Sequence, residues 1–146
     1  MATTIGAGPR LSVNERDRRY AAVRDRLKER GIDCAVVMGT NLFYLTNGLA
    51  GERFAVLPAS DEPISVTIHT RHLIDLAPQV LIDSQEWIKD VRAAFDASGC
   101  IQRIKELHLE NGTLGLADST AAVGGLSHGF YTQIQAAFPN AKLVDI

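Results

Sequence analysis

The chain has 146 residues, which is the usual size of one globular domain and is long enough to bury a core. Its 15 basic and 17 acidic side chains nearly cancel, so the composition indicates neither a nucleic-acid-binding surface nor a polybasic membrane-binding tract. No apolar run approaches the roughly 18 residues of a membrane span, and residues 1–10 lack the apolar stretch of a secretory signal. We therefore expect a cytoplasmic protein with a disordered tail over 1–10 and one domain over 11–146.

The first predicted element is a helix over 13–30. Ser12 and Glu15 match a capping box at its start, and Gly31 supplies the left-handed residue that ends many helices. Its apolar side chains recur on one face: Tyr20, Val23 and Leu27. The apolar run over 32–38 then predicts a strand that is covered on both faces of a sheet.

The middle of the chain predicts a β-hairpin. Two apolar segments, 54–57 and 64–68, are separated by 58–63, which holds two prolines and two acidic residues and therefore favours a turn. A short helix over 71–76 and a short strand over 80–82 are predicted next.

The last third alternates again between helices and strands. Helices are predicted over 98–110 and 126–138, and strands over 114–117 and 142–144. The alternation predicts an α/β fold of three layers, in which a mixed sheet of five or six strands carries helices on both faces.

The sequence shows no catalytic or metal-binding arrangement. His69 and His72 form an HxxH pair, which does not match the i, i+4 spacing of helical zinc sites. Asp118, Ser119 and His128 contain the residue types of a hydrolase triad, but no GxSxG elbow holds a serine. We therefore predict no catalytic residue and no metal ligand in this chain.

Three further features are interpreted as structural. Cys34 and Cys100 are too far apart in sequence for a CxxC pair and are expected to be reduced packing residues. The glycine-rich segment 124–129 lacks the lysine of a phosphate-binding loop, so it is interpreted as a loop in front of a helix, with Ser127 as the helix cap.

The segment NLFYLTNG over 41–48 places two aromatic residues and two leucines between turn-forming residues. Together with the preceding GIDCAVV over 31–37, it resembles the N-terminal domain of the creatinase/prolidase/aminopeptidase P family of metallopeptidases, which includes the Xaa-Pro dipeptidases. The motif residues are Asn41, Tyr44, Leu45, Thr46 and Gly48. Further matches follow in the same order: 54–58, Trp87 with Asp90, 104–107, 112–116 and 138–145.

The resemblance implies a ribonuclease H-like arrangement of the sheet. One position departs from the family, which commonly has glycine directly after the threonine, whereas this chain has Asn47 there and Gly48 next. Asparagine tolerates the left-handed conformation, so we expect Asn47 to adopt a positive φ. We also expect Asn41 to cap a single helical turn, and Tyr44 and Leu45 to pack in the core.

The resemblance also implies what the chain does and does not contribute. Catalysis in the family belongs to a C-terminal domain of pita-bread fold, where two Asp, one His and two Glu bind two divalent metal ions such as Mn, Co or Zn. This chain alone is therefore expected to be inactive, and its parent to be a homodimeric metal-dependent Xaa-Pro dipeptidase. The loop over 49–53 is expected to approach the partner subunit's active site, with Phe43 and Arg53 as substrate-rim or dimer contacts.

Three alternatives stay open at this point. The chain could be a stand-alone, non-catalytic binding module, which is favoured only if the gene ends at residue 146. It could belong to a creatinase-like amidinohydrolase, because those enzymes share this domain. A free-standing hydrolase that uses His69 or His128 is the third, although neither has an identifiable nucleophile beside it.

Overall fold

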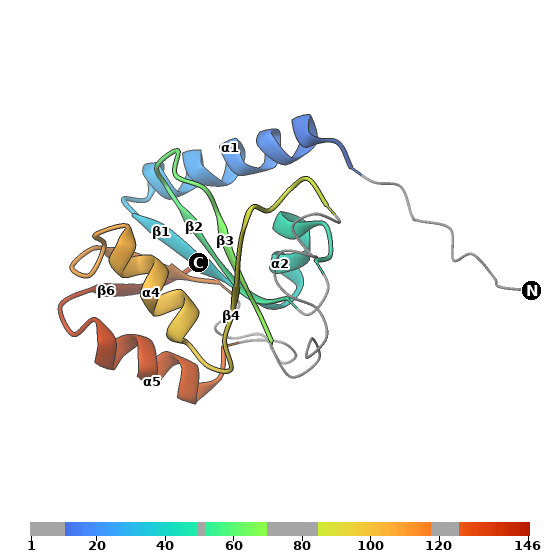
Figure 1. Cartoon of the computed structure of the whole chain (residues 1–146). Helices are drawn as coiled ribbons and strands as arrows, with labels where there is room; N and C mark the ends of the chain where they lie inside the picture. The colour runs from blue at the N-terminus through green and yellow to red at the C-terminus, as the bar shows by residue number, and fades with distance from the viewer. Residues whose placement is uncertain (1–10, 50–51, 70–84, 118–125) are drawn as a thin grey trace, which may run out of the picture.

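A computed structural model describes residues 11–49, 52–69, 85–117 and 126–146 (Figure 1). The elements follow in the order α1 (Val13–Glu29), β1 (Cys34–Val37), α2 (Gly39–Thr46), β2 (Glu52–Pro58), β3 (Ser65–Ile68), β4 (Asp90–Ala93), α4 (Ser98–Glu106), β5 (Thr113–Leu116), α5 (His128–Ala137) and β6 (Lys142–Asp145). The tail over 1–10, the predicted helix over 71–76 and the predicted strand over 80–82 lie outside the described residues.

The strands form one six-stranded mixed sheet in the order β4-β3-β2-β1-β5-β6. Strand β2 is antiparallel to both of its neighbours, β1 and β3, whereas the β1–β5, β5–β6 and β3–β4 pairs are parallel. The predicted mixed sheet and the predicted β2–β3 hairpin are confirmed. It follows that β1, β3, β4, β5 and β6 all end at one edge of the sheet, here called the carboxyl edge, where β2 begins.

Helices cover both faces of the sheet, as predicted (Figure 1). Along β1, Ala35 and Val37 belong to the core cluster beneath α1 and α2, while Cys34 and Val36 belong to the cluster beneath α4 and α5. All four residues are buried, because a central strand with helices on both sides has no solvent-facing side chains. The two cysteines are free and buried, as expected, and burial raises the pKa of Cys34 to about 12.

Strand β4 was missed by the sequence analysis, although Asp90 was part of the family resemblance. It is a four-residue edge strand whose side chains are only partly buried, so it lacks the continuous apolar run that identifies interior strands. Its charged residues form ion pairs instead: the Arg92 guanidinium contacts Asp90 of the same strand at 2.8 Å and Glu106 of α4 at 2.6 Å.

Local signals explain the start of α1. The Ser12 hydroxyl accepts a hydrogen bond from the Glu15 amide at 3.2 Å, as the capping box predicts. The Glu15 carboxylate accepts bonds from Arg18 and Arg19, and these contacts lower its pKa from 4.5 to about 2. After the helix, Gly31 has φ +64 and turns the chain toward β1, as predicted.

Helix α4 ends at Glu106, four residues before the predicted end. His108 adopts the left-handed conformation with φ +56, and the amide of Leu109 donates to the carbonyl of Ile104 at 3.1 Å. This is the hydrogen-bond pattern of a helix terminus, and it allows the Leu109 side chain to pack against the core. The predicted extension to residue 110 was wrong for that reason.

Helix α4 also makes a close contact with the sheet. Gly99 lies against Thr67 of β3, where a Cβ atom added to Gly99 would come within 2.6 Å of the Thr67 hydroxyl oxygen. Only glycine fits there without a shift of the helix, so this contact sets the distance between α4 and the strand.

Candidate functional site

Helix α2 carries the NLFYLTNG segment and leaves β1 without a connecting loop. Gly39 has φ +62 and is the first residue of the helix, while Met38 stands at the N-cap without a side-chain hydrogen bond. Asn41 therefore lies inside the first turn, and its predicted role as the cap of a single turn was wrong. The positive φ of Gly39 reverses the chain directly, so the helix starts three residues earlier than expected.

The end of α2 agrees with the prediction for Asn47. This residue has φ 56, and its amide donates to the carbonyl of Phe43 at 3.0 Å. The buried Thr46 hydroxyl donates to the Leu42 carbonyl at 3.0 Å and accepts from the Gly48 amide at 3.2 Å. The threonine of the motif thus locks the turn that follows the helix.

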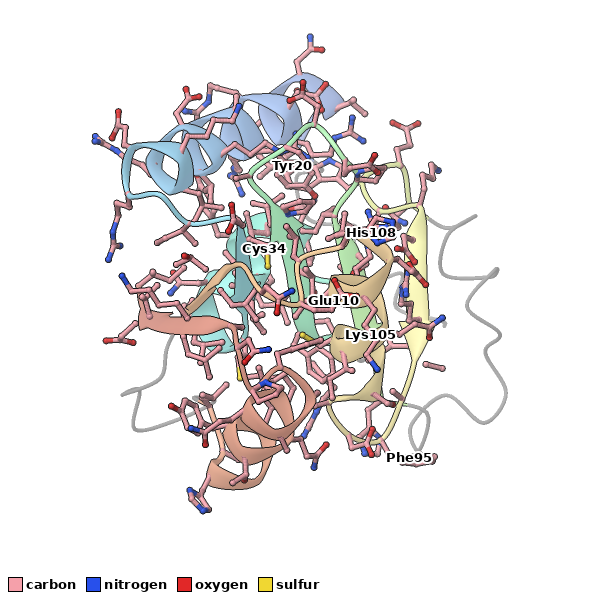
Figure 2. The ribbon with its side chains drawn as sticks, turned by 90° about the vertical axis from the view of Figure 1, so that its left-hand side faces the viewer. Tyr20, Cys34, Phe95, Lys105, His108 and Glu110 are labelled. Carbon is pink, nitrogen blue, oxygen red and sulfur yellow. The ribbon has the colours of Figure 1, made fainter. Side chains whose placement is uncertain are left out.

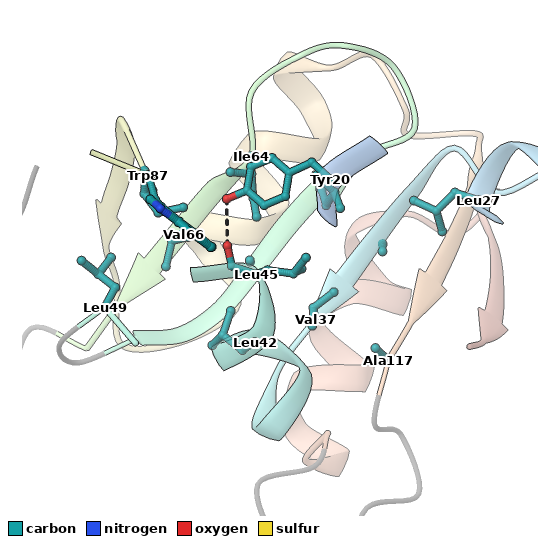
Figure 3. Close-up of a cluster of buried hydrophobic side chains, with 14 of the residues drawn as sticks. Tyr20, Leu27, Val37, Leu42, Leu45, Leu49, Ile64, Val66, Trp87 and Ala117 are labelled. Carbon is teal, nitrogen blue, oxygen red and sulfur yellow. Dashed lines mark hydrogen bonds between the residues drawn. The ribbon is translucent and has the colours of Figure 1, made fainter. Parts of the chain in front are cut away.

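Side chains of α1 satisfy two further carbonyl groups at this helix end. The Tyr20 hydroxyl donates to the Leu45 carbonyl at 2.8 Å, as Figure 3 shows, and Arg19 donates to the Tyr44 carbonyl at 2.8 Å. The last carbonyl groups of a helix have no partners within it, so these bonds replace solvent. Helix α2 is therefore held in place from outside its own segment.

The two aromatic residues of α2 point away from the core. Leu42 and Leu45 are buried, whereas Phe43 is 61% exposed and Tyr44 is 42% exposed. The core prediction is confirmed for Leu45 and was wrong for Tyr44. A helix on the outside of a sheet buries one stripe of residues, and Tyr44 lies beside that stripe, where the Arg19 guanidinium stacks 4.4 Å from the centre of its ring.

A cleft of about 460 Å³ opens at the carboxyl edge of the sheet. Its walls come from the start of α2, the start of β2, the segment between β4 and α4, and the first half of α5. Residues that line it include Gly39, Glu52, Arg53, Phe95, Asp96 and Phe130. We call it the carboxyl-edge cleft. In open α/β sheets, ligand sites commonly lie outside the carboxyl ends of the strands.

Arg53 lines this cleft, and Phe43 does not. Phe43 instead covers Gly48, where an added Cβ would come within 2.7 Å of its ring. The two residues that the sequence analysis named as substrate-rim or dimer-contact candidates thus do not line the same cleft. Asn41 and Tyr44 line a second, largely apolar groove of about 310 Å³ that also contains Leu27 and Ile146.

Charged groups of both signs face the carboxyl-edge cleft. Burial raises the pKa of the half-buried Glu52 carboxylate, although this group accepts a hydrogen bond from the Leu49 amide at 3.2 Å. Hydrogen bonds from Ser98 lower the pKa of the exposed Asp96, whose carboxylate accepts from the Ser98 amide at 2.9 Å. The Arg53 side chain is exposed and makes no hydrogen bond or ion pair within the described part of the chain.

The sequence analysis missed Phe95, Asp96 and Phe130 as possible site residues. A signal for Asp96 was available, because a carboxylate two residues before a helical amide is a common capping arrangement. Nothing in the sequence placed Phe95, since it follows the edge strand that was not predicted. Figure 2 shows Phe95 at the opposite end of the domain from Tyr20 and α1.

The other candidate residues of the sequence analysis are histidines, carboxylates and serines. Within residues 11–49, 52–69, 85–117 and 126–146, no group of three or more His, Cys, Asp and Glu side chains is placed to hold a metal ion. His72 of the HxxH pair, and Asp118 and Ser119 of the considered triad, lie outside the described residues. Ser127 accepts a hydrogen bond from the Phe130 amide at 3.2 Å and caps α5, as predicted. None of the helices in the described ranges is long and apolar enough to cross a membrane.

A mixed six-stranded sheet with this order of helices defines the class of the domain: it is the α/β architecture of creatinase- and prolidase-type N-terminal domains. The family model described as the Creatinase/Prolidase N-terminal domain matches residues 19–146. The chain belongs to this family, and the resemblance found in the sequence is confirmed. No curated protein sequence matches the chain significantly.

Solved structures support the same fold. An aminopeptidase P from Streptococcus thermophilus matches with a TM-score of 0.64 at 18% identity, over 92% of this chain and 91% of that chain. The N-terminal domain of an X-Pro dipeptidase from Streptococcus pyogenes matches with a TM-score of 0.58 at 13% identity, over 88% and 93%. A prolidase from Thermococcus sibiricus matches with a TM-score of 0.63 at 17% identity, over 94% of this chain and 35% of that chain. The chain thus spans about a third of the length of that prolidase.

Proposed function

We propose that this chain is the non-catalytic N-terminal domain of a cytoplasmic Xaa-Pro dipeptidase-type metallopeptidase. In the full-length protein it would pack against its own C-terminal catalytic domain, contribute to a homodimer and form part of the rim of the partner subunit's active site. Membership in the family supports the domain assignment. The names of the similar structures, which include two prolidases, an aminopeptidase P and an X-Pro dipeptidase, support the choice of reaction.

The observation that carries the rim assignment is the state of Arg53. Its guanidinium is exposed in a concave surface and is not engaged by another described residue. A guanidinium group can bind a carboxylate through two parallel hydrogen bonds, and a dipeptide substrate carries such a carboxylate at its end. Arg53 would therefore position the substrate and not take part in bond cleavage.

The metal ions of the proposed reaction would belong to the catalytic domain. The described residues hold no cluster of ligands that fits a pair of Mn, Co or Zn ions. Bound there, such ions would lower the pKa of a water molecule that attacks the Xaa-Pro bond. This chain alone is accordingly expected not to hydrolyse Xaa-Pro dipeptides.

The rim assignment is tested in the full-length peptidase with Arg53→Ala. Loss of a charged hydrogen bond of about 1–3 kcal/mol should lower kcat/KM roughly 5- to 150-fold, mainly through KM. Arg26→Ala is the matched control, because Arg26 lies on α1, outside the cleft, and its side chain is 80% exposed. Unchanged kcat/KM across several dipeptides would show that Arg53 is not a substrate contact.

Two further measurements test the other parts of the proposal. The purified 146-residue chain, freed of contaminating peptidases, should show no Xaa-Pro hydrolysis with added metal, and clear turnover would overturn the proposal. Phe43→Ala in the full-length protein should raise the dimer dissociation constant in sedimentation experiments. Arg26→Ala, which removes an exposed side chain of α1 outside the cleft, should leave this constant unchanged. Equal effects of the two variants would contradict a specific role of Phe43.

A further inference from the structure

The carboxyl-edge cleft has the size and shape of a small-molecule site. Its volume of about 460 Å³ falls within the range of roughly 300–1,000 Å³ that is typical of ligand pockets. Four segments that are distant in sequence meet there, because β1, β4 and β5 end at this edge and β2 begins at it. A concave site of this size fits a small molecule better than an extended polymer.

Opposite charges face the same cavity. Arg53 supplies an exposed cation that no described residue neutralises, and Asp96 supplies an exposed carboxylate. Glu52 is a second carboxylate, and each of the two accepts a hydrogen bond from one backbone amide. Glu52 is half-buried whereas Asp96 is exposed, so Asp96 is the more accessible of the two. A ligand with a single charge would satisfy only one side of this arrangement. A ligand with a carboxylate and an ammonium group satisfies both.

The remaining walls combine apolar and aromatic residues with the polar side chains of Ser127 and Gln133. Phe54 and Phe130 form an edge-to-face pair with ring centres 4.9 Å apart, and Met38 and Leu42 extend this buried surface. Phe95 is 71% exposed at the mouth of the cleft, which is unusual for a phenylalanine of a folded domain. An apolar ligand side chain would cover part of that ring and release the water around it.

From these features we infer that the carboxyl-edge cleft binds a small apolar zwitterion, namely an apolar amino acid or dipeptide. Its carboxylate contacts Arg53, its ammonium group contacts Asp96, and its side chain lies against Phe95 and Phe130. The inference rests on the proposed function for the choice of dipeptides as the leading class. It goes further in assigning Phe95 and Asp96 as specificity-determining residues and in placing the binding site within this domain alone.

The test is a titration of the ¹⁵N-labelled 146-residue chain with L-leucyl-L-proline, followed by NMR. Amide signals of Gly39, Phe95 and Ala97 should shift together, with a Kd of millimolar order. N-acetyl-leucyl-proline lacks the ammonium group and leucyl-prolinamide lacks the carboxylate, so each should bind at least about tenfold more weakly. Absence of shifts at these residues, or equal binding of the blocked and free dipeptides, would overturn the inference.

Two variants and a control make the assignment specific. Arg53→Gln should weaken the binding of leucyl-proline about tenfold or more but leave the weak binding of leucyl-prolinamide unchanged. Asp96→Asn keeps a side-chain oxygen for the Ser98 amide and should show the reverse selectivity, with N-acetyl-leucyl-proline unaffected. Arg26→Gln on α1 should change neither. If both cleft variants bind all three compounds as the unmodified chain does, the inference is wrong.

This experiment separates the inference from the proposed function. If the isolated chain binds no dipeptide while Arg53→Ala still lowers kcat/KM of the full-length peptidase, the cleft is not a site of its own and the rim role stands. If the chain binds leucyl-proline as described while Arg53→Ala leaves the peptidase unchanged, the inference is supported and the rim role is refuted.

Discussion

The contact between Tyr20 and α2 allows a sharp test of how the domain holds its NLFYLTNG segment. The Tyr20 hydroxyl donates to the Leu45 carbonyl at 2.8 Å, and both residues are buried (Figure 3). Tyr20→Phe keeps the ring and removes only the hydroxyl group, so the substitution tests the hydrogen bond without removing the packing of the ring. The Leu45 carbonyl, which lies in the last turn of its helix, then loses this buried partner.

The expected cost follows from the burial of that carbonyl. Leaving a buried acceptor without a partner destabilises a protein by about 1–3 kcal/mol. With an m-value of about 2 kcal/mol per molar urea for a domain of this size, the unfolding midpoint should fall by about 0.5–1.5 M. Urea unfolding followed by circular dichroism measures this shift directly.

Tyr131→Phe is the matched control for this substitution. Tyr131 is partly buried in the cluster beneath α4 and α5, and its hydroxyl makes no hydrogen bond within the described residues. Its loss should change the midpoint by less than about 0.25 M, equivalent to the 0.5 kcal/mol typical of neutral substitutions. If Tyr20→Phe and Tyr131→Phe unfold at the same urea concentration, the hydroxyl does not hold α2 in place and the reasoning fails.

Three further predictions concern the backbone and the charges of the domain. Gly99→Ala should destabilise the domain by about 1–3 kcal/mol, because the new methyl group would overlap the Thr67 side chain. Gly129→Ala, whose methyl group would meet no atom within 4 Å, should stabilise the domain by about 0.4–1 kcal/mol. Thermal unfolding that ranks the two variants in the opposite order would contradict the packing argument. Asn47→Ala should lower the free energy of unfolding by about 1–2 kcal/mol, because Asn47 has φ 56 and alanine disfavours this left-handed conformation, whereas Asn47→Gly should not lower it. Equal stability of the two variants in urea would refute a role for this backbone conformation. The pKa of Glu15 is lowered from its ordinary value of 4.5 to about 2 in the folded state, so its ionised form stabilises the fold above pH 4.5 and loses this effect as the pH falls toward 2. The stability difference between the unmodified chain and Glu15→Gln should therefore shrink over that interval. A difference that does not depend on pH would be inconsistent with the lowered pKa.

Much of the fold was predictable because its signals are local. The hydroxyl of Ser12, the glycine at position 31 and the side chain of Ser127 each act on backbone groups within three residues, and all three behave as their sequence positions indicate. The apolar run of β1 is continuous because helices cover both of its faces. Such features depend on near neighbours in the chain and are therefore visible without a structure.

The errors arose where a distant segment decides the outcome. Tyr44 is an aromatic residue in an apolar segment, which favours burial, yet α2 packs with Leu42 and Leu45 inward and leaves Tyr44 beneath the Arg19 guanidinium. Strand β4 has a mixed composition, and it is a strand because its residues pair with β3 and its charges pair with α4. Neither partner is near in sequence, so no local pattern predicts the result.

The sequence by itself determined the family of this chain, the order of most helices and strands and the left-handed turn at Asn47. Each of these follows from residue types at short spacing, whose preferences act before the chain is folded. Only the tertiary structure decided that Arg53 lies in a cleft with Phe95 and Asp96, and that Phe43 does not line this cleft. The reason is topological: β2 runs in the opposite direction to β3 and β4, so the start of β2 and the residues after β4, which are more than 40 residues apart in sequence, meet at one edge of the sheet. Side chains there become neighbours only after the sheet has formed.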